Sequence, residues 1–157
     1  MAAKDDSEAE AIIANLTSFG FRVGLVLESE VEGRLATVRL ISEGEIEIYV
    51  DLLFASSGIE SEVVERAERI EIFHGTTVKV ASLSSLIALK VLSANIKTRP
   101  QDVIDLGNLI KAGTKQELSE AFELVELITS RNYNRKKNLR DDLERYVENF
   151  LGSGEQS

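Results

Sequence analysis

One acidic residue of this 157-residue sequence stands in an unusual place. Asp51 follows Val50 and precedes three apolar residues, Leu52 to Phe54, where an extended segment ends. A carboxylate at the end of a strand can ligate Mg²⁺ or act as a base towards a hydroxyl. A single carboxylate does not make a magnesium site for phosphate transfer, which needs several converging oxygens. The alternative is an acid that is only solvated, or held by a partner, at the strand end.

A lysine in an apolar segment is the second candidate. Lys90 is the only charged residue between Leu83 and Ile96. An ammonium in such a helix either extends along its stem to water or meets an anion. A triphosphate would be such an anion, with the lysine acting as a point charge. The sequence leaves both interpretations open.

Two aspartates form the third candidate, because Asp102 and Asp105 lie three residues apart and share one face of a helix. Asp102 follows Pro100 in the first turn, where an acid also complements the helix dipole. Asp105 lies further in, between two apolar residues, so a structural explanation requires a cation. Arg99 and Lys90 are the candidates for that cation.

A basic run follows in a chain whose formal charge is −9. It could bind RNA or phosphate, with Tyr133 available to stack on a base. The alternative, which the sequence slightly favours, is a solvated connection between two helices, with cations near the end of the first. The basic residues are Arg131, Arg135, Lys136, Lys137 and Arg140.

Composition excludes several other classes of protein. Without cysteine there are no disulfides, thiolate zinc sites or cysteine nucleophiles. The single histidine, His74, stands beside Gly75 and is interpreted as a turn residue. The acidic balance argues against nucleic-acid binding over the whole surface. No apolar stretch is long enough to span a bilayer and the acidic N-terminus does not suit a signal peptide, so we expect a soluble, cytoplasmic protein.

The pattern along the chain predicts an α+β fold in a single domain of residues 1–151, strand-rich over 1–80 and helical over 81–151. Gly20 ends a first helix. Short turns then separate three runs that we expect to form an antiparallel meander: 21–28, 34–41 and 45–54. Period-two alternation in the third run places Ile46, Ile48, Val50 and Leu52 on one face. The tail, 152–157, is predicted to be disordered.

The remaining elements are mostly helices. A helix after Gly58, with Glu60 on its outer side, precedes a hairpin of 70–73 and 76–80. Ser82 then caps a buried helix that carries Lys90. Three more helices are expected, at 101–112, 115–130 and 137–151.

Four stretches taken together resemble a known family: LATVRL (35–40), VDLLFASSGIE (50–60), LIALKVL (86–92) and RPQDVIDL (99–106). In order and spacing they resemble the minimal nucleotidyltransferase superfamily, in the branch around AbiEii-type toxins. The resemblance covers most of the chain, from the first helix to the basic run.

This resemblance implies a nucleotidyltransferase-like mixed sheet packed by helices. It also implies Mg²⁺ and transfer of a nucleoside monophosphate from an NTP to a hydroxyl of RNA or protein. Asp51 matches the third carboxylate of the family, beside its metal site. Lys90 and Arg99 are expected near the nucleotide phosphates, and Asp102 and Asp105 match the paired acids of the following helix.

The chain departs from the family pattern at its start. Family members carry a Gly-Gly or Gly-Ser turn and an Asp-x-Asp pair on the first core strand, and neither is present here. Asp5 and Asp6 are adjacent and cannot replace that pair, because a strand would point them to opposite faces. We therefore expect a late start or a lost metal-binding half, and a chain that is inactive as given.

Two functional hypotheses follow. The chain is either part of a nucleotidyltransferase or a non-catalytic binding or regulatory module with the same fold. Under both, loss of the first strand would expose a sheet edge and favour a homodimer through it. The resemblance to toxins also raises an antitoxin as a possible partner.

Overall fold

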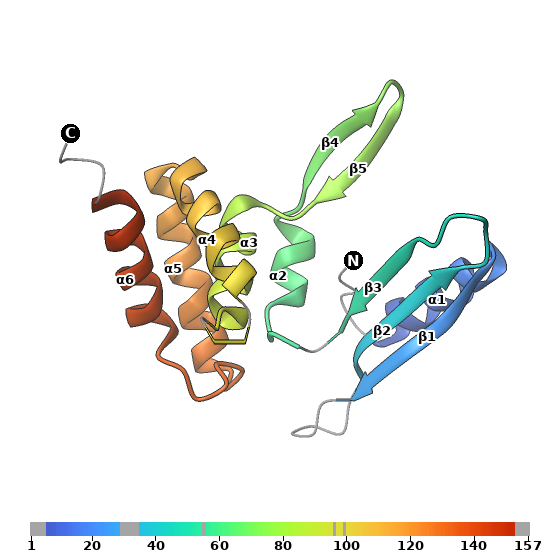
Figure 1. Ribbon diagram of the computed structural model, residues 1–157, viewed down its shortest axis with the longest axis horizontal. Helices are drawn as coiled ribbons and strands as arrows, with labels where there is room; N and C mark the ends of the chain where they lie inside the picture. Colours follow the sequence, from blue (N-terminus) through green and yellow to red (C-terminus); the bar gives the residue numbers. More distant parts are fainter. Residues whose placement is uncertain (1–5, 29–34, 55, 96, 99, 153–157) are drawn as a thin grey trace. The chain divides into compact units, whose positions relative to one another are not determined.

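The computed structural model describes residues 6–28, 35–54, 56–95, 97–98 and 100–152 (Figure 1). Strands dominate the first half of the chain and helices the second, which confirms the predicted α+β class. In chain order the elements are α1 (Asp6–Ser18), β1 (Phe21–Glu28), β2 (Leu35–Ser42), β3 (Tyr49–Leu53), α2 (Glu60–Glu65), β4 (Glu68–Phe73), β5 (Thr76–Val80), α3 (Leu83–Ser93), α4 (Pro100–Ala112), α5 (Lys115–Ser130) and α6 (Leu139–Leu151).

Contacts within the chain group its residues into two compact units, and each is described here by itself. The first comprises residues 1–56 with 60–65, and the second comprises residues 57–59 with 66–157. All strand pairs that the structure describes are antiparallel.

The first unit is a three-stranded meander in the order β1-β2-β3, with α1 packed on one face. Side chains of alternate strand residues build its core, because successive residues point to opposite faces. The central strand β2 supplies Val38 and Leu40. Strand β3 supplies Leu52, and Phe54 follows directly after it. Apolar residues of α1, including Ile12 and Leu16, pack against this cluster. Gly20 follows α1 with a φ of 81°, as expected of a glycine at a helix end.

The third strand is shorter than predicted, because the chain turns where the sequence pattern continues. The Ser42 hydroxyl donates to the carbonyl of Ile46 at 2.8 Å and accepts from the amide of Ile48 at 2.8 Å. These bonds hold residues 45–48 in the connection, and β3 begins only at Tyr49. The prediction of a strand over 45–54 is therefore wrong for residues 45–48, and Ile46 and Ile48 are 76% and 54% exposed.

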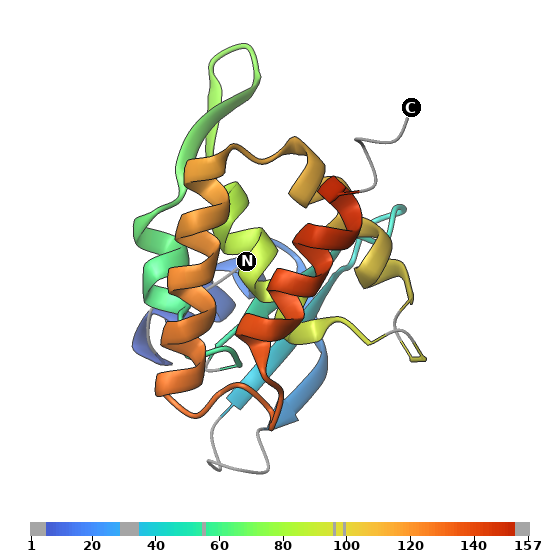
Figure 2. The ribbon, with the colours of Figure 1, turned by 90° about the vertical axis from the view of Figure 1, so that its left-hand side faces the viewer.

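The second unit is built around α3, which packs against α4, α5 and α6 (Figure 2). Its core contains Ile87, Val91, Leu106, Leu124 and Leu143, all almost completely buried. As predicted, Ser82 caps α3, since its side chain accepts from the amide of Ser85. The predicted helix at 115–130 is also confirmed, and a capping box between Thr114 and Glu117 fixes its start.

A two-stranded hairpin of β4 and β5 belongs to the same unit and projects from its helices (Figures 1 and 2). It starts at Glu68, two residues earlier than predicted, because the chain leaves α2 at Glu65. Glu60 is not on the outer side of α2 as predicted. It is buried, and its Oε1 accepts from the amide of Ser56 at 2.8 Å.

Candidate functional site

Asp51 lies on β3 directly opposite Arg39 of β2. The guanidinium holds the carboxylate through both oxygens, with Nε 2.6 Å from Oδ1 and the terminal nitrogen 2.8 Å from Oδ2. Both side chains are partly exposed, at 44% and 41%. The hydrogen bond from Arg39 holds the pKa of Asp51 below its ordinary value, and Asp51 raises the pKa of Arg39. The acid is therefore held by a partner of opposite charge.

Such an acid does not fit a magnesium ligand. Mg²⁺ is bound in octahedral geometry by several oxygen ligands, whereas each oxygen of this single carboxylate already accepts a hydrogen bond from a cation. Within the residues that the structure describes, no three acidic, histidine or cysteine side chains gather closely enough to hold a metal ion. The donor set around Asp51 thus does not fit the ion that the family resemblance implies.

Lys90, Asp102 and Asp105 lie together in the second unit. The ammonium of Lys90, on α3, is 2.7 Å from Oδ1 of Asp102 and 2.8 Å from Oδ2 of Asp105, both on α4. Gln101 donates to the other oxygen of Asp105 at 2.9 Å. The exposed fractions of the side chains are 30% for Lys90, 12% for Asp102 and 37% for Asp105. We call this group the Lys90 triad.

Opposite charges explain why Lys90 and Asp105 occur in these helices. Hydrogen bonds to Asp102 and Asp105 raise the pKa of Lys90, and the bond from Lys90 lowers the pKa of Asp105. The anions that Lys90 meets are thus carboxylates of the next helix, and Lys90 is the partner that Asp105 required. Arg99, the other predicted nucleotide-binding residue, lies outside the described residues.

Three cations of the predicted basic patch make contacts within the second unit. Arg131 donates to the carbonyl of Gly58. The Lys137 ammonium donates to the carbonyls of Leu92 and Ala94 at 2.7 and 2.8 Å, at the end of α3. Burial lowers the pKa of Lys137. These contacts favour the structural interpretation of the basic run.

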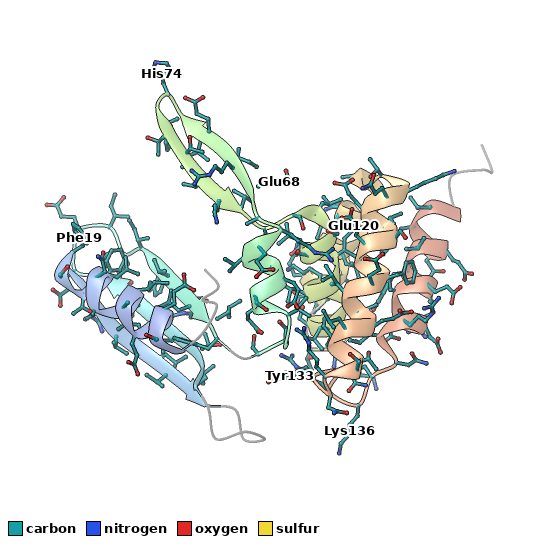
Figure 3. The ribbon with its side chains drawn as sticks, turned by 180° about the vertical axis from the view of Figure 1, so that it is seen from behind. Phe19, Glu68, His74, Glu120, Tyr133 and Lys136 are labelled. Atoms are coloured by element: carbon teal, nitrogen blue, oxygen red, sulfur yellow. The ribbon has the colours of Figure 1, made fainter. Side chains whose placement is uncertain are left out.

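The third of these cations lies on α6. Arg140 forms an ion pair with Glu126 of α5, and its guanidinium lies over the ring of Phe122 at 5.9 Å from the centroid. The Arg140 side chain therefore links α6 to α5. The other two predicted patch residues, Arg135 and Lys136, both have left-handed backbone, with φ of 53° and 61°. Lys136 points away from the helices of this unit (Figure 3).

Tyr133, expected to be available for stacking on a base, is instead half-buried against Gly58. Gly58 has a φ of 73°, and a Cβ there would lie 2.5 Å from the Tyr133 ring. The glycine is thus required both by its backbone conformation and by the close approach of the ring. The sequence pattern gives no sign of this contact or of the role of Arg39, because the first joins residues distant in sequence and the second depends on strand register.

A comparison with protein families gives one further finding. The family model described as "Nucleotidyl transferase AbiEii toxin, Type IV TA system" matches residues 5–153. No curated protein matches the chain. In the described part of the chain, no helix has both the length and the apolar character needed to cross a membrane.

Proposed function

Because the chain belongs to the AbiEii nucleotidyl transferase toxin family, we propose that its reaction class is nucleotidyl transfer. A hydroxyl oxygen of an RNA or protein acceptor would bond to the α-phosphorus of an NTP. The bond from that phosphorus to the bridging oxygen would break, pyrophosphate would leave, and the hydroxyl proton would pass to a base. We further propose that the sequence as given does not complete this reaction alone.

The observation that carries the second part of the proposal is the bidentate pair of Arg39 and Asp51. Phosphoryl transfer depends on cations that neutralise charge on the transferring group, and such cations need free carboxylate ligands. Asp51 is bound by an arginine, and the acids of the Lys90 triad are bound by a lysine. These groups support structural roles: Arg39 joins β2 to β3, and Lys90 joins α3 to α4.

The partners and cofactor belong to the same proposal. The family description supports an antitoxin as a protein partner and an NTP as the donor substrate. The family resemblance also implies Mg²⁺, but we assign this ion to none of the described residues. An RNA acceptor receives little support from the basic run, because Arg131, Lys137 and Arg140 are engaged within the second unit.

A second candidate function is a non-catalytic module that pairs with itself or with a partner protein. It is favoured by the apolar side chains that strand β1 of the three-stranded sheet exposes. On β1, Val23, Leu25, Val26 and Leu27 are each about half exposed. Exposed apolar side chains of this kind mark surfaces for association.

A label-transfer assay tests the proposal. The chain is incubated with Mg²⁺, each of the four α-³²P-labelled NTPs in turn, and mixed RNA and protein acceptors. We expect no more labelled acceptor with the wild-type chain than with Asp51→Asn, a variant that removes one charge at nearly constant shape. Transfer by the wild-type chain that Asp51→Asn abolishes would contradict the structural role of Asp51.

A further inference from the structure

The β4–β5 hairpin has the composition of an association surface. Every residue of β4 is exposed, including Ile70 at 44%, Ile72 at 49% and Phe73 at 73%. Ile70 lies opposite Val78 and Glu68 lies opposite Val80, so one face of the hairpin is largely apolar. An isolated two-stranded hairpin is marginally stable in water and gains from further strands. The outer edge of β4 offers unpaired backbone groups for such a strand.

The other face of the hairpin has an unbalanced charge pattern. Arg69 lies directly opposite Lys79, and like charges in that position destabilise a strand pair. Glu71 lies opposite Thr77, and its Oε1 accepts from the amide of Gly75 at 2.7 Å. Among the described residues, no acid lies within ion-pair distance of Arg69 or Lys79. An acidic side chain beyond the β4 edge would therefore relieve the repulsion.

A second copy of the chain supplies that acid in one register. We propose that two copies associate through their β4 edges as antiparallel strands, with Ile70 opposite Ile70 of the second copy. In this register Arg69 of each copy lies opposite Glu71 of the other, which gives two symmetric ion pairs. The two hairpins then form one four-stranded antiparallel sheet in which the Ile70 side chains meet on the apolar face.

Neighbouring registers are disfavoured by charge. A two-fold axis at Arg69 would place Arg69 against itself, and an axis at Glu71 would place Glu71 against itself. An axis at Ile72 would coincide with the register irregularity between Glu71 and Phe73, where strand pairing is disturbed. For a second copy of the chain, charge complementarity and the irregularity after Glu71 thus favour the register centred on Ile70.

The two edges of the three-stranded sheet are less suitable. An antiparallel pair of β3 strands about its centre places Asp51 against itself. The pairing of β1 with β2 shifts register twice, between Val23 and Leu25 and between Leu27 and Glu28. Such irregularities twist a strand and protect its edge from pairing. Association through β4 does not depend on whether the chain transfers nucleotides.

Disulfide trapping tests the interface directly, because the natural chain contains no cysteine. Directly opposite residues of antiparallel strands have Cα atoms about 4.5–5.5 Å apart, within reach of a disulfide. We expect Ile70→Cys to form a covalent dimer under mild oxidation at least about tenfold faster than the matched control Val78→Cys, which carries its thiol opposite in the same hairpin but on β5. Equal rates for the two variants, or no dimer with Ile70→Cys, would overturn the proposal.

A charge swap tests the register with the same readout. In the Ile70→Cys background, Arg69→Glu places two acids opposite each other and is expected to slow dimer formation about tenfold. Adding Glu71→Arg restores opposite charges and should restore the rate. The matched control Lys115→Glu makes the same charge change at the exposed start of α5 and should have no effect. Failure of the swap to restore the rate, or an equal effect of Lys115→Glu, would overturn the proposed register.

Discussion

The Arg39–Asp51 pair and the Lys90 triad have nearly the same geometry in different surroundings. Their hydrogen bonds are 2.6 and 2.8 Å in the first unit, and 2.7 and 2.8 Å in the second. In the pair both side chains are more than 40% exposed, whereas Asp102 of the triad is 12% exposed.

This difference in burial separates the two groups energetically. An exposed ion pair contributes little to stability, because water and salt screen it and two long side chains are immobilised. Removing one partner of a buried pair is costly, since the other charge remains in a poorly solvated place. Short distances alone therefore do not identify the more important contact.

The largest effect is expected from removing the central cation of the triad. Lys90→Met keeps an unbranched apolar side chain but leaves Asp102 and Asp105 without their ammonium. We expect the free energy of unfolding in urea to fall by about 2–4 kcal/mol. Lys115→Met, at an exposed position of α5, is the matched control, and an equal loss in both variants would contradict the role of the triad.

The two acids of the triad should differ. Asp102→Asn is expected to lower the free energy of unfolding by about 1–2 kcal/mol, because Asp102 is nearly buried and its partner ammonium loses a charged acceptor. Asp105→Asn should cost less, since Asp105 is more exposed and Gln101 also contacts it. Urea unfolding measures the loss of free energy in each variant. A larger loss with Asp105→Asn than with Asp102→Asn would contradict the role of burial.

The exposed pair should give a smaller change. Asp51→Asn is expected to lower the free energy of unfolding by roughly a quarter of the Lys90→Met effect. High salt should reduce this difference further, whereas it should change the Lys90→Met difference little. The measurement is urea unfolding of each variant at low and high NaCl, and a loss with Asp51→Asn as large as with Lys90→Met would show that burial is not the deciding factor.

The change of the free energy of unfolding with pH should be the smallest effect. The pKa values of Asp51 and Asp105 are lowered in the folded chain. Their contribution to stability is thus full above the ordinary aspartate pKa, about 4, and is lost as the pH falls through the lower folded values. The raised pKa of Lys90 acts at the other end: its contribution is full below the ordinary lysine pKa and is lost as the pH rises through the folded value.

The free energies of unfolding of the wild type and of Asp51→Asn should therefore differ most near neutral pH and become equal in acid. A difference that grows below pH 4 would show that folding raises the pKa of Asp51 instead of lowering it.

Local signals predicted much of the second unit. The helix expected at 115–130 is α5, and Ser82 caps α3 as expected. The helices α3 and α4 follow each other closely in the sequence, so they were expected to be neighbours. An ion pair between Lys90 on the first and Asp105 on the second could therefore be proposed from the sequence. Such features depend on residues close in sequence, so a pattern can reveal them.

Features that depend on strand register could not be predicted. The turn expected at residues 42–44 would pair Ile41 with Glu45 and place Arg39 opposite Glu47. The observed register pairs Ile41 with Tyr49 and brings Arg39 to Asp51. The bonds from Ser42 to residues 46 and 48 cause this shift of four residues, and alternation of apolar residues gives no sign of them.

The contact between Gly58 and Tyr133 was also beyond the sequence pattern. It joins residues 75 positions apart through a ring that approaches a left-handed glycine. The glycine was recognisable as a turn residue, but its neighbour was not. The sequence therefore offered no packing partner for Tyr133 that would argue against its interpretation as a base-stacking residue.

Calorimetric titration of the chain with Mg²⁺ and each of the four NTPs tests most directly the central claim that its acids serve structure. We expect no saturable, Mg²⁺-dependent heat with the wild type, Asp51→Asn or Lys90→Ala. Saturable binding by the wild type that both variants abolish, while Lys115→Ala retains it, would contradict purely structural roles for these residues. It would instead assign Asp51 and Lys90 to a working nucleotide site.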